Sequence, residues 1–410
     1  MDPFHLFAGV FAVAALFSYL NHRFLGLPTT IGVMAMGLVA SIALLVLDAL
    51  GLDIAGSAEL VVEQLEFRES LLGSMLAFLL FAGALHVDGA ALSKQWRVVS
   101  LLATVGIVVT TFLVATCLFA FLWFLGIQAS YLECLLFGAL ISPTDPIAVL
   151  GVLTKVGAPK SLETKIAGES LFNDGVGVVF FAVILGLVTG SGAGPSGAVV
   201  LFAQEVVGGL VLGLAGGAAC FYLLRSIEDY SVEVLLTLAL AAGLYSLAMA
   251  LHTSGPLAVV VAGLFIGNTG RRFGMDEATR EHLDTFWKLV DEVLNVFLFA
   301  LIGLELLVID FSPQSVLLGV LAVPVVLFGR WVSITGVVRA LGRVRVFTPG
   351  AITILTWGGL RGGISVALAL SIPPSVAGRS WILAVTYVVV VFSILVQGLT
   401  IGRLVRSKTV

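Results

Sequence analysis

Charged residues are scarce in this sequence. Only 11% of its 410 residues are Asp, Glu, Lys or Arg, whereas 59% are hydrophobic; a soluble globular domain has roughly 25% and about 45–50%. A water-soluble core cannot bury so much apolar sequence. Apolar runs of about 17 to 25 residues, long enough to cross a hydrocarbon layer of roughly 30 Å, recur along the chain. The composition therefore predicts an all-α polytopic membrane protein that lies in a lipid bilayer.

Cysteine and histidine are equally sparse, and neither forms a known motif. The three cysteines make no CxxC pair and the five histidines make no HExxH, which argues against a disulfide framework, a zinc site or a metalloprotease. The formal net charge is −4, so there is no basic signature of nucleic-acid binding. We therefore expect no cofactor, no nucleic-acid partner and no enzymatic activity.

We predict about thirteen membrane spans in a single transmembrane domain that covers residues 1–410. The expected spans are 4–20, 29–49, 70–87, 99–125, 130–154, 163–189, 197–224, 231–251, 255–268, 282–308, 314–342, 349–371 and 380–402. The first of them lacks the basic residues and the small-residue cleavage site of a signal peptide, so we expect it to be retained.

Lysine and arginine are distributed unevenly among the connections. The connections that follow the odd-numbered spans hold most of them, whereas the other connections hold only Arg68 and Arg379. Because basic connections stay in the cytoplasm, this pattern predicts an N-terminus outside and a C-terminus in the cytoplasm, with the protein in the cell (inner) membrane.

Two of the expected spans are interrupted near their middles. Residues 142–146, Ser-Pro-Thr-Asp-Pro, break the fifth span, and residues 357–363, Trp-Gly-Gly-Leu-Arg-Gly-Gly, break the twelfth. Proline and paired glycines weaken a helix, and unwound backbone is tolerated inside a membrane only where protein or water satisfies it. The two spans enter from opposite sides, which predicts inverted repeats of roughly 1–190 and 231–410 whose broken helices cross near the midplane.

The sixth span carries polar residues where apolar ones are expected. Burying ionisable groups in a bilayer costs at least a few kcal/mol each, so Glu169 and Asp174 are candidates for a functional site. Ser170 and Asp174 share one helix face, and Glu169 and Asn173 share the neighbouring face. Carboxylate, hydroxyl and backbone carbonyl oxygens, the last freed by the break at Thr144, are ligands that suit a monovalent cation.

Proton and cation are expected to compete at Asp174. Desolvation disfavours a charged carboxylate, so Asp174 must hold either a proton or a cation when the surrounding helices move. That competition predicts exchange of one ion for the other. The alternative is that Asp174 is a structural carboxylate with hydrogen bonds to a neighbouring helix.

Three further interpretations of charged residues remain open. Asp145 can cap the half-helix that follows the break or bind the cation directly. Arg361 needs a buried partner, and Glu169 is the candidate. Lys288, Asp291 and Glu292 lie at i, i+3 and i+4, where they form either salt bridges on a wet face or a funnel that attracts cations.

Four motifs together resemble those of the NhaP-type monovalent cation/proton antiporters, bacterial relatives of the eukaryotic sodium/proton exchangers. They are Ser142-Pro143-Thr144-Asp145-Pro146, Gly168-Glu169-Ser170 with Asn173-Asp174, Phe297-Leu298-Phe299 with Gly303-Leu304-Glu305, and Gly358-Gly359-Leu360-Arg361-Gly362-Gly363. The resemblance covers nearly the whole chain, and the combination in this order is specific although each motif alone is weak.

The resemblance implies an NhaA-like antiporter fold in a homodimer, with alternating access that exchanges Na⁺, or K⁺ or Li⁺, for protons in pH and cation homeostasis. It further implies that Asp174 carries cation and proton, that Ser170 and Thr144 are cation ligands, and that Glu169 and Arg361 form a structural pair. The Asn173-Asp174 pair is similar to that of the electroneutral branch, which implies one proton per cation.

One position departs from the family pattern. Family members often carry an acidic residue in the third span after a run like Leu79-Leu80-Phe81, but Ala82 follows that run here. The resemblance therefore leaves the ligand shell and the preferred ion open.

Two other functions can be weighed against exchange. A cation channel or uniporter would line a pore with the same polar breaks, but no repeated selectivity-filter motif is present. An intramembrane aspartyl protease would use Asp145 and Asp174 as a pair that shares a proton, but neither lies in a Gly-x-Gly-Asp setting.

Overall fold

The computed structural model describes residues 3–51, 70–190, 194–273, 275, 277–342 and 347–409. Within these ranges the regular structure is helical, apart from one isolated antiparallel bridge between Asp145 and Leu360. An all-helical architecture suits a membrane, because a helix satisfies its own backbone polar groups.

The helices of the first half are α1 (Pro3–Leu20), η1 (Asn21–Leu25), α2 (Thr29–Ala49), α4 (Ser70–Leu85), α5 (Gly89–Leu101), η2 (Leu102–Gly106), α6 (Ile107–Phe124), α7 (Tyr131–Ile141), α8 (Ile147–Val156), α9 (Lys160–Thr189) and α10 (Gly194–Leu224). Those of the second half are α11 (Tyr230–Ala250), α12 (Gly255–Phe265), η3 (Ile266–Gly270), α13 (Arg271–Phe273), α14 (Glu277–Leu304), η4 (Glu305–Leu307), α15 (Pro313–Leu341), α16 (Ala351–Trp357), α17 (Gly363–Leu370), α18 (Arg379–Phe392), η5 (Ser393–Gln397) and α19 (Gly398–Thr409).

Helices lie on every expected span, and 8 of the described helices or joined helices are long and apolar enough to cross a membrane by themselves. The total of thirteen spans remains a prediction. The fourth span is longer than expected, because α5, η2 and α6 form one helix over Gly89–Phe124. Its start at residue 99 was wrong: the Asp88 carboxylate caps the helix by accepting hydrogen bonds from the amides of Ala90 and Ala91 at 2.8 and 3.1 Å.

The fifth and twelfth spans are each divided into two short helices, as the proline and glycine motifs predict. The first break separates α7 from α8, and the second separates α16 from α17. The start of α7 is fixed by a capping box in which Ser130 and Glu133 satisfy each other's backbone amides. Because the start of α7 is fixed, the position of the break at its end is also defined.

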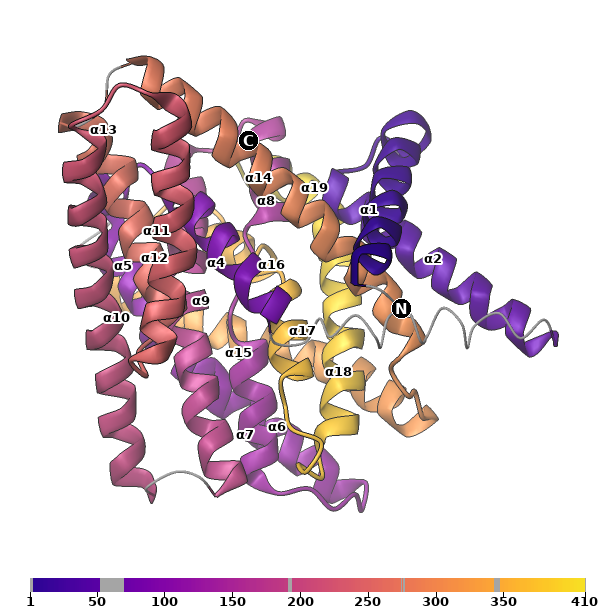
Figure 1. Ribbon diagram of the computed structural model, residues 1–410. Coiled ribbons are helices and arrows are strands. Elements are labelled where there is room, and N and C mark those ends of the chain that lie inside the picture. The colour runs from indigo at the N-terminus through magenta and orange to yellow at the C-terminus, as the bar shows by residue number, and fades with distance from the viewer. Residues whose placement is uncertain are drawn as a thin grey trace.

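Figure 1 shows how these helices are arranged. α10, α11 and α12 form one side of the molecule, and α1 and α2 form the opposite side. α14 runs between the two sides and packs against both α2 and α4. It therefore connects the peripheral helices with the centre, where the broken helices lie.

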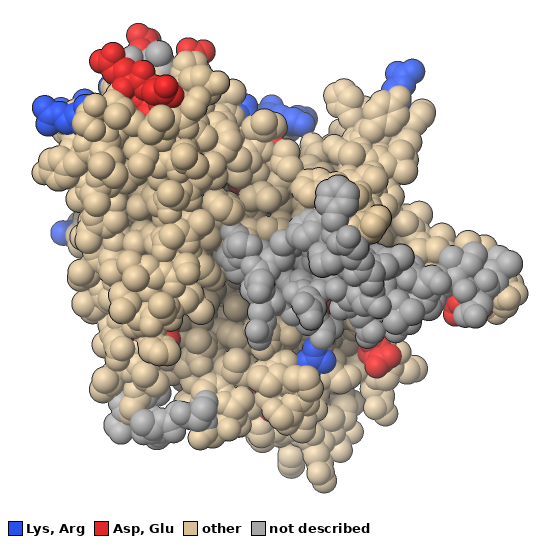
Figure 2. All heavy atoms as spheres, in the orientation of Figure 1, with Lys and Arg blue, Asp and Glu red and all other residues tan. Residues whose placement is uncertain are grey.

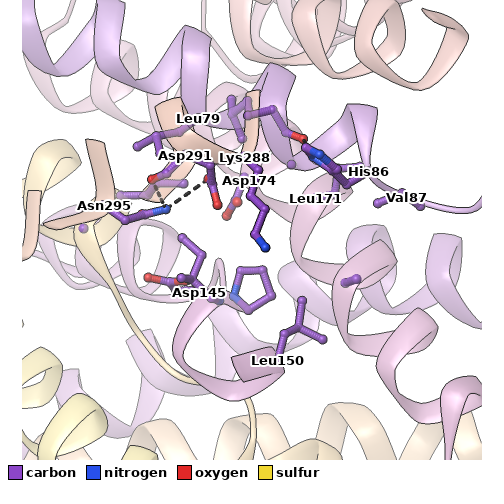
Figure 3. A pocket seen from close by; sticks show the side chains of 18 of the residues that line it. Leu79, His86, Val87, Asp145, Leu150, Leu171, Asp174, Lys288, Asp291 and Asn295 are labelled. Atoms are coloured by element: carbon purple, nitrogen blue, oxygen red, sulfur yellow. Dashed lines mark hydrogen bonds between the residues drawn. The ribbon is translucent and has the colours of Figure 1, made fainter. Parts of the chain in front are cut away.

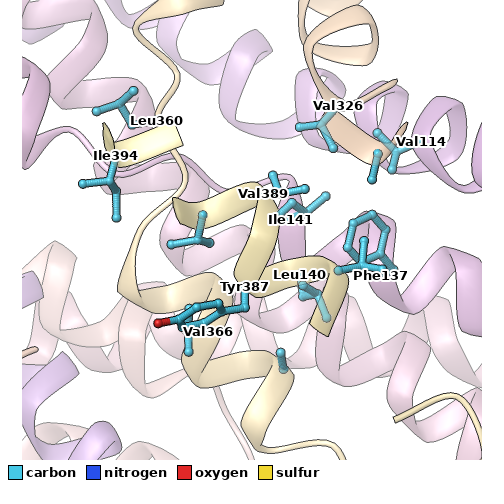
Figure 4. Close-up of a cluster of buried hydrophobic side chains, with 14 of the residues drawn as sticks. Val114, Phe137, Leu140, Ile141, Val326, Leu360, Val366, Tyr387, Val389 and Ile394 are labelled. Carbon is cyan, nitrogen blue, oxygen red and sulfur yellow. The ribbon is translucent and has the colours of Figure 1, made fainter. Parts of the chain in front are cut away.

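Two large clusters of buried apolar side chains hold the bundle together. One joins α6, α7, α15, α17 and α18 and includes Phe137, Val326 and Tyr387 (Figure 4). The other joins α4, α10, α11, α12 and α14 around Phe81 and Trp287. The indole nitrogen of Trp287 donates to the Thr237 hydroxyl at 3.0 Å, so this buried ring is also satisfied as a donor.

The outer surface is apolar over most of its height. Figure 2 shows Lys, Arg, Asp and Glu side chains gathered mainly at one end of the molecule, the end at which α13 and the C-terminus lie in Figure 1. Large apolar side chains such as Val199 and Val211 of α10 and Phe124 of α6 are exposed below it. An apolar belt beneath a charged end is the surface expected of a multi-pass membrane protein.

Candidate functional site

The two interrupted helices meet at their breaks. The Asp145 amide donates a hydrogen bond of 2.8 Å to the Leu360 carbonyl, which makes the isolated antiparallel bridge. Pro143 and Pro146 interrupt the helix in the first segment, and the glycines of the second allow close approach. A β-carbon at Gly362 would overlap the Asp145 carboxylate. The expected crossing of two discontinuous helices is therefore confirmed, and glycine is needed there because another chain segment occupies the space.

Arg361 satisfies the carbonyl groups that the first break leaves free. Its guanidinium donates to the carbonyls of Ser142 and of Pro143, the latter at 2.8 Å. Its own amide donates to the Ser393 hydroxyl at 2.8 Å. Arg361 therefore holds unwound backbone in a buried place, which is what such backbone requires inside a membrane.

The expected pair between Glu169 and Arg361 is wrong. Glu169, whose exposed fraction is 1%, is bound instead by Arg330 of α15, which is 6% exposed. The two guanidinium Nη atoms donate to the two carboxylate oxygens, Nη2 to Oε2 at 3.0 Å. Arg330 also donates to the Leu355 carbonyl of α16 at 3.2 Å. A two-point pair with extra hydrogen bonds is the geometry in which buried charges compensate each other.

Thr144, Ser170 and Asn173 form a buried polar cluster beside the break. The Asn173 side chain accepts from the Thr144 amide at 3.2 Å and donates to the Thr144 hydroxyl at 2.8 Å. The hydroxyls of Thr144 and Ser170 are 3.0 Å apart. The structure thus brings together three of the residues that the sequence singled out and fixes Thr144 against α9.

Asp174 differs from these neighbours because one of its carboxylate oxygens has no hydrogen-bond partner among the described residues. It is only 5% exposed, and its Oδ1 atom accepts no hydrogen bond from any residue that the structure describes. Leaving a buried charged oxygen unsatisfied costs at least 1–3 kcal/mol, by the usual order of magnitude. The alternative in which Asp174 is tied by hydrogen bonds to another helix is therefore not what the structure shows.

Asp145 acts as a cap in this structure. Its Oδ1 atom accepts from the Ile147 amide at 2.9 Å at the start of α8. The residue also faces the cavity that contains Asp174. Capping and contact with an ion in that cavity are therefore compatible, and both interpretations of Asp145 remain.

Asp145 and Asp174 line a cavity of about 770 Å³ (Figure 3). One wall is formed by apolar residues of α4, among them Leu79 and Ala82. The cavity extends as far as Asp88 and Lys160, at the starts of α5 and α9. Both lie in connections that follow odd-numbered spans, which hold most of the lysine and arginine outside the spans. We call this the basic end of the bundle, and the cavity leads from it to Asp174.

The wall opposite the break is built by α14. Lys288, Asp291 and Asn295 line the cavity from this helix (Figure 3), whereas Glu292 does not. Lys288 and Asp291 thus belong to the cavity that the funnel interpretation predicts, and no ion pair joins Lys288 to another residue in the described part of the chain. Asn295 was missed in the sequence; its spacing of i+4 from Asp291 was the available signal.

A polytopic bundle in which two broken helices cross beside a partner-free buried carboxylate is the architecture of a secondary ion transporter. The sequence matches the family model "Sodium/hydrogen exchanger, transmembrane" over residues 11–407. It is 48% identical to the Na⁺/H⁺ antiporter NhaP of Pseudomonas aeruginosa over 407 residues, covering 98% of this chain and 96% of that one. It is 35% identical to the Na⁺/H⁺ antiporter NhaH of Halobacillus dabanensis, covering 93% and 92% of the two chains.

The chain therefore belongs to the sodium/hydrogen exchanger family. Its fold also matches the solved structure of the sodium proton antiporter MjNhaP1 from Methanocaldococcus jannaschii, with a TM-score of 0.78 and 20% sequence identity over 100% of this chain and 99% of that one. At that identity the likeness shows the fold, which is the antiporter fold that the motifs predict.

Proposed function

We propose that this protein exchanges Na⁺ for H⁺ across the membrane by alternating access, with Asp174 as the residue that both ions occupy in turn. The observation that carries this proposal is the partner-free Oδ1 atom of Asp174, buried at the inner end of a cavity that leads to the basic end of the bundle. Relatives over nearly the whole length are named Na⁺/H⁺ antiporters.

The chemistry follows from the cost of an isolated charge in a low-dielectric place. Asp174 is neutralised either by a proton or by a cation, and it has room for one at a time. Thr144 and Ser170, whose hydroxyls already meet beside the break, supply neutral oxygens, and Asn173 orients Thr144. One carboxylate that binds one ion or the other gives one proton per cation, so exchange is electroneutral.

Three buried charges around the crossing belong to the scaffold. Glu169 and Arg330 compensate each other, and Arg361 is committed to backbone carbonyls. Neither arginine has to move or change its charge when the ion at Asp174 changes. Asp174 therefore exchanges its ion beside three charges that stay fixed.

The remaining features of the proposal concern the cell. We infer from the basic connections that the C-terminus lies in the cytoplasm and the N-terminus outside, in the cell (inner) membrane, and that the cavity faces the cytoplasm in this conformation. The resemblance supports a homodimer. The protein acts as a transporter without a cofactor and without enzymatic activity, and it works in pH and cation homeostasis.

Purified wild-type protein, Asp174→Asn and the control Asp310→Asn should be reconstituted in proteoliposomes that contain a pH-sensitive dye. Asp310 is exposed and lies outside the cavity, so its variant controls for loss of one carboxylate. Addition of Na⁺, K⁺ or Li⁺ should move protons in wild type and in Asp310→Asn, with the voltage clamped or free, and Asp174→Asn should move none.

Equal exchange by Asp174→Asn and wild type would overturn the assignment of Asp174. Cation flux in wild type without any proton movement would overturn exchange and favour a channel or uniporter. The cation that gives the lowest KM identifies the preferred substrate.

A further inference from the structure

Asn295 of α14 has a side-chain oxygen without a hydrogen-bond partner in the described part of the chain. Its amide nitrogen donates to the Asp291 carbonyl at 2.8 Å and to the Asp291 carboxylate at 3.0 Å. Its Oδ1 atom accepts no hydrogen bond from any described residue, although the side chain is only 2% exposed. The two donors of the amide are thus engaged on one side, and the acceptor is left for another group.

Asp291 lies one helical turn before Asn295, on the same wall of the cavity. Its side chain is half-buried, and Figure 3 shows it bound to Asn295 and facing the same cavity as Asp145 and Asp174. Only Asn295 donates a hydrogen bond to its carboxylate among the residues that the structure describes. Asp145 and Asp291 both line this cavity, and a cation between two carboxylates reduces the repulsion between like charges.

The wall formed by α4 offers nothing comparable. Its lining residues, Leu79, Leu80, Ala82 and Gly83 among them, present no side-chain oxygen. A cation that enters the cavity therefore finds no side-chain oxygen on α4 and must replace lost water from the other walls, which include Asp88, Thr154, the break, α9 and α14. Asn295 and Asp291 are the groups on the α14 side that supply an amide oxygen and a carboxylate.

We propose that Asp291 and Asn295 form a second cation-binding position, at which a monovalent cation exchanges part of its water for protein oxygens before it reaches Asp174. This inference rests on the proposed function. A monovalent ion fits better than a divalent one, because no three His, Cys, Asp or Glu side chains in the described ranges converge to hold a metal ion, and Ca²⁺ requires several charged ligands.

Lys288 keeps the affinity of this position for a cation low. It lies on the same wall, three residues before Asp291, and its side chain extends into the cavity (Figure 3). An ammonium group within the cavity lowers the affinity for a second cation by repulsion. A transported ion must leave as readily as it enters, so weak binding at this position suits its place on the path.

The test compares the Na⁺ dependence of proton exchange for Asp291→Asn and Asn295→Leu with that for Glu292→Gln. Glu292 is the adjacent carboxylate on the exposed side of α14 and does not line the cavity, so its variant changes the same charge outside the position. Asp291→Asn should raise the KM for Na⁺ about tenfold, equivalent to about 1.4 kcal/mol, with little change in the maximal rate. Glu292→Gln should keep the wild-type KM, and Lys288→Gln should lower it.

Asn295→Leu should raise KM in the same direction, and Asp291→Glu should restore most of the affinity. Melting curves show whether each variant is folded. If Asn295→Leu is not folded, the KM of Asp291→Glu serves as the second measurement. A KM in Asp291→Asn equal to that in Glu292→Gln overturns the second position. That result, together with an inactive Asp174→Asn, leaves the proposed function standing, whereas a wild type without exchange would remove both.

Discussion

Glu169 and Asp174 lie on the same helix and are both buried, but the two sides of α9 give them opposite surroundings. On one side Glu169 meets a guanidinium that donates to both of its oxygens and that also contacts α16. On the other side Asp174 faces a cavity and has an oxygen without any partner among the described residues. One helix therefore holds a compensated charge and an uncompensated one five residues apart.

The difference separates scaffold from site in physical terms. A compensated charge is stable in place, and its removal leaves a partner behind. An uncompensated charge is stabilised only by a particle from outside, which is the condition for binding a proton or a cation in turn. The sealed side of α9 should therefore respond to substitution mainly in stability, and the cavity side mainly in transport.

The largest effect on stability is expected at the sealed side. Arg330→Met leaves Glu169 buried without its cation, which should lower the free energy of unfolding by about 3–5 kcal/mol. Thermal unfolding in detergent, followed by size-exclusion chromatography of the heated samples, measures the loss. Asp174→Asn should have the melting temperature of wild type, because it removes a charge from the same helix without leaving an opposite charge unpaired.

The double variant Glu169→Gln/Arg330→Met sharpens this contrast. It removes both charges together and should recover much of the stability that Arg330→Met loses. If Arg330→Met alone has the melting temperature of wild type, water must reach Glu169, and the carboxylate does not depend on Arg330.

A smaller effect is expected where the broken helices cross. Arg361→Met removes a charged donor from the carbonyls of Ser142 and Pro143, and such hydrogen bonds contribute about 1.5–3 kcal/mol. The same melting assay should show an intermediate loss for Arg361→Met and none for Arg403→Met, since Arg403 is exposed on α19. Equal melting temperatures for these two variants would mean that the crossing is held by other contacts.

The smallest effect on stability is expected at Thr144, on the cavity side. Thr144→Val removes a neutral hydroxyl from Ser170 and Asn173, which costs about 0.5–1.5 kcal/mol, but it also removes a proposed cation ligand. Thr111→Val deletes a similarly buried hydroxyl that bonds Ser142 and the Gly138 carbonyl. Both variants should have a slightly lower melting temperature, and only Thr144→Val should raise the KM for Na⁺. If both variants have the same KM, Thr144 is not a cation ligand.

Hydropathy and helix-breaking residues were sufficient to predict the membrane class, the helix positions and the two breaks, because each is a local property of the chain. The boundary at residue 99 failed because Lys94 and Arg97 make the first turns of that helix polar, although Asp88 is a clear cap. The polar residues of α9 were found for the same local reason. They are ionisable or hydrogen-bonding groups in an apolar helix.

The partner of Glu169 was not predictable in this way. Arg330 and Arg361 both lie inside apolar helices, and sequence spacing does not say which of them faces α9. The choice depends on the arrangement around the crossing, where the unwound carbonyls engage Arg361 and leave Arg330 for Glu169. Asn295 was overlooked for a related reason, since a single amide in a helix has meaning only once the cavity beside it is known.

Arg361 lies 219 residues after Ser142, whose carbonyl it satisfies. During synthesis the first broken helix emerges from the ribosome long before Arg361 exists, so its open carbonyls must be hydrated or bound elsewhere until the twelfth span is inserted. The first half of the chain therefore cannot reach its final form in the membrane until almost the whole protein has been made. Assembly of this transporter is therefore completed late in synthesis, when Arg361 binds the carbonyls of the first break.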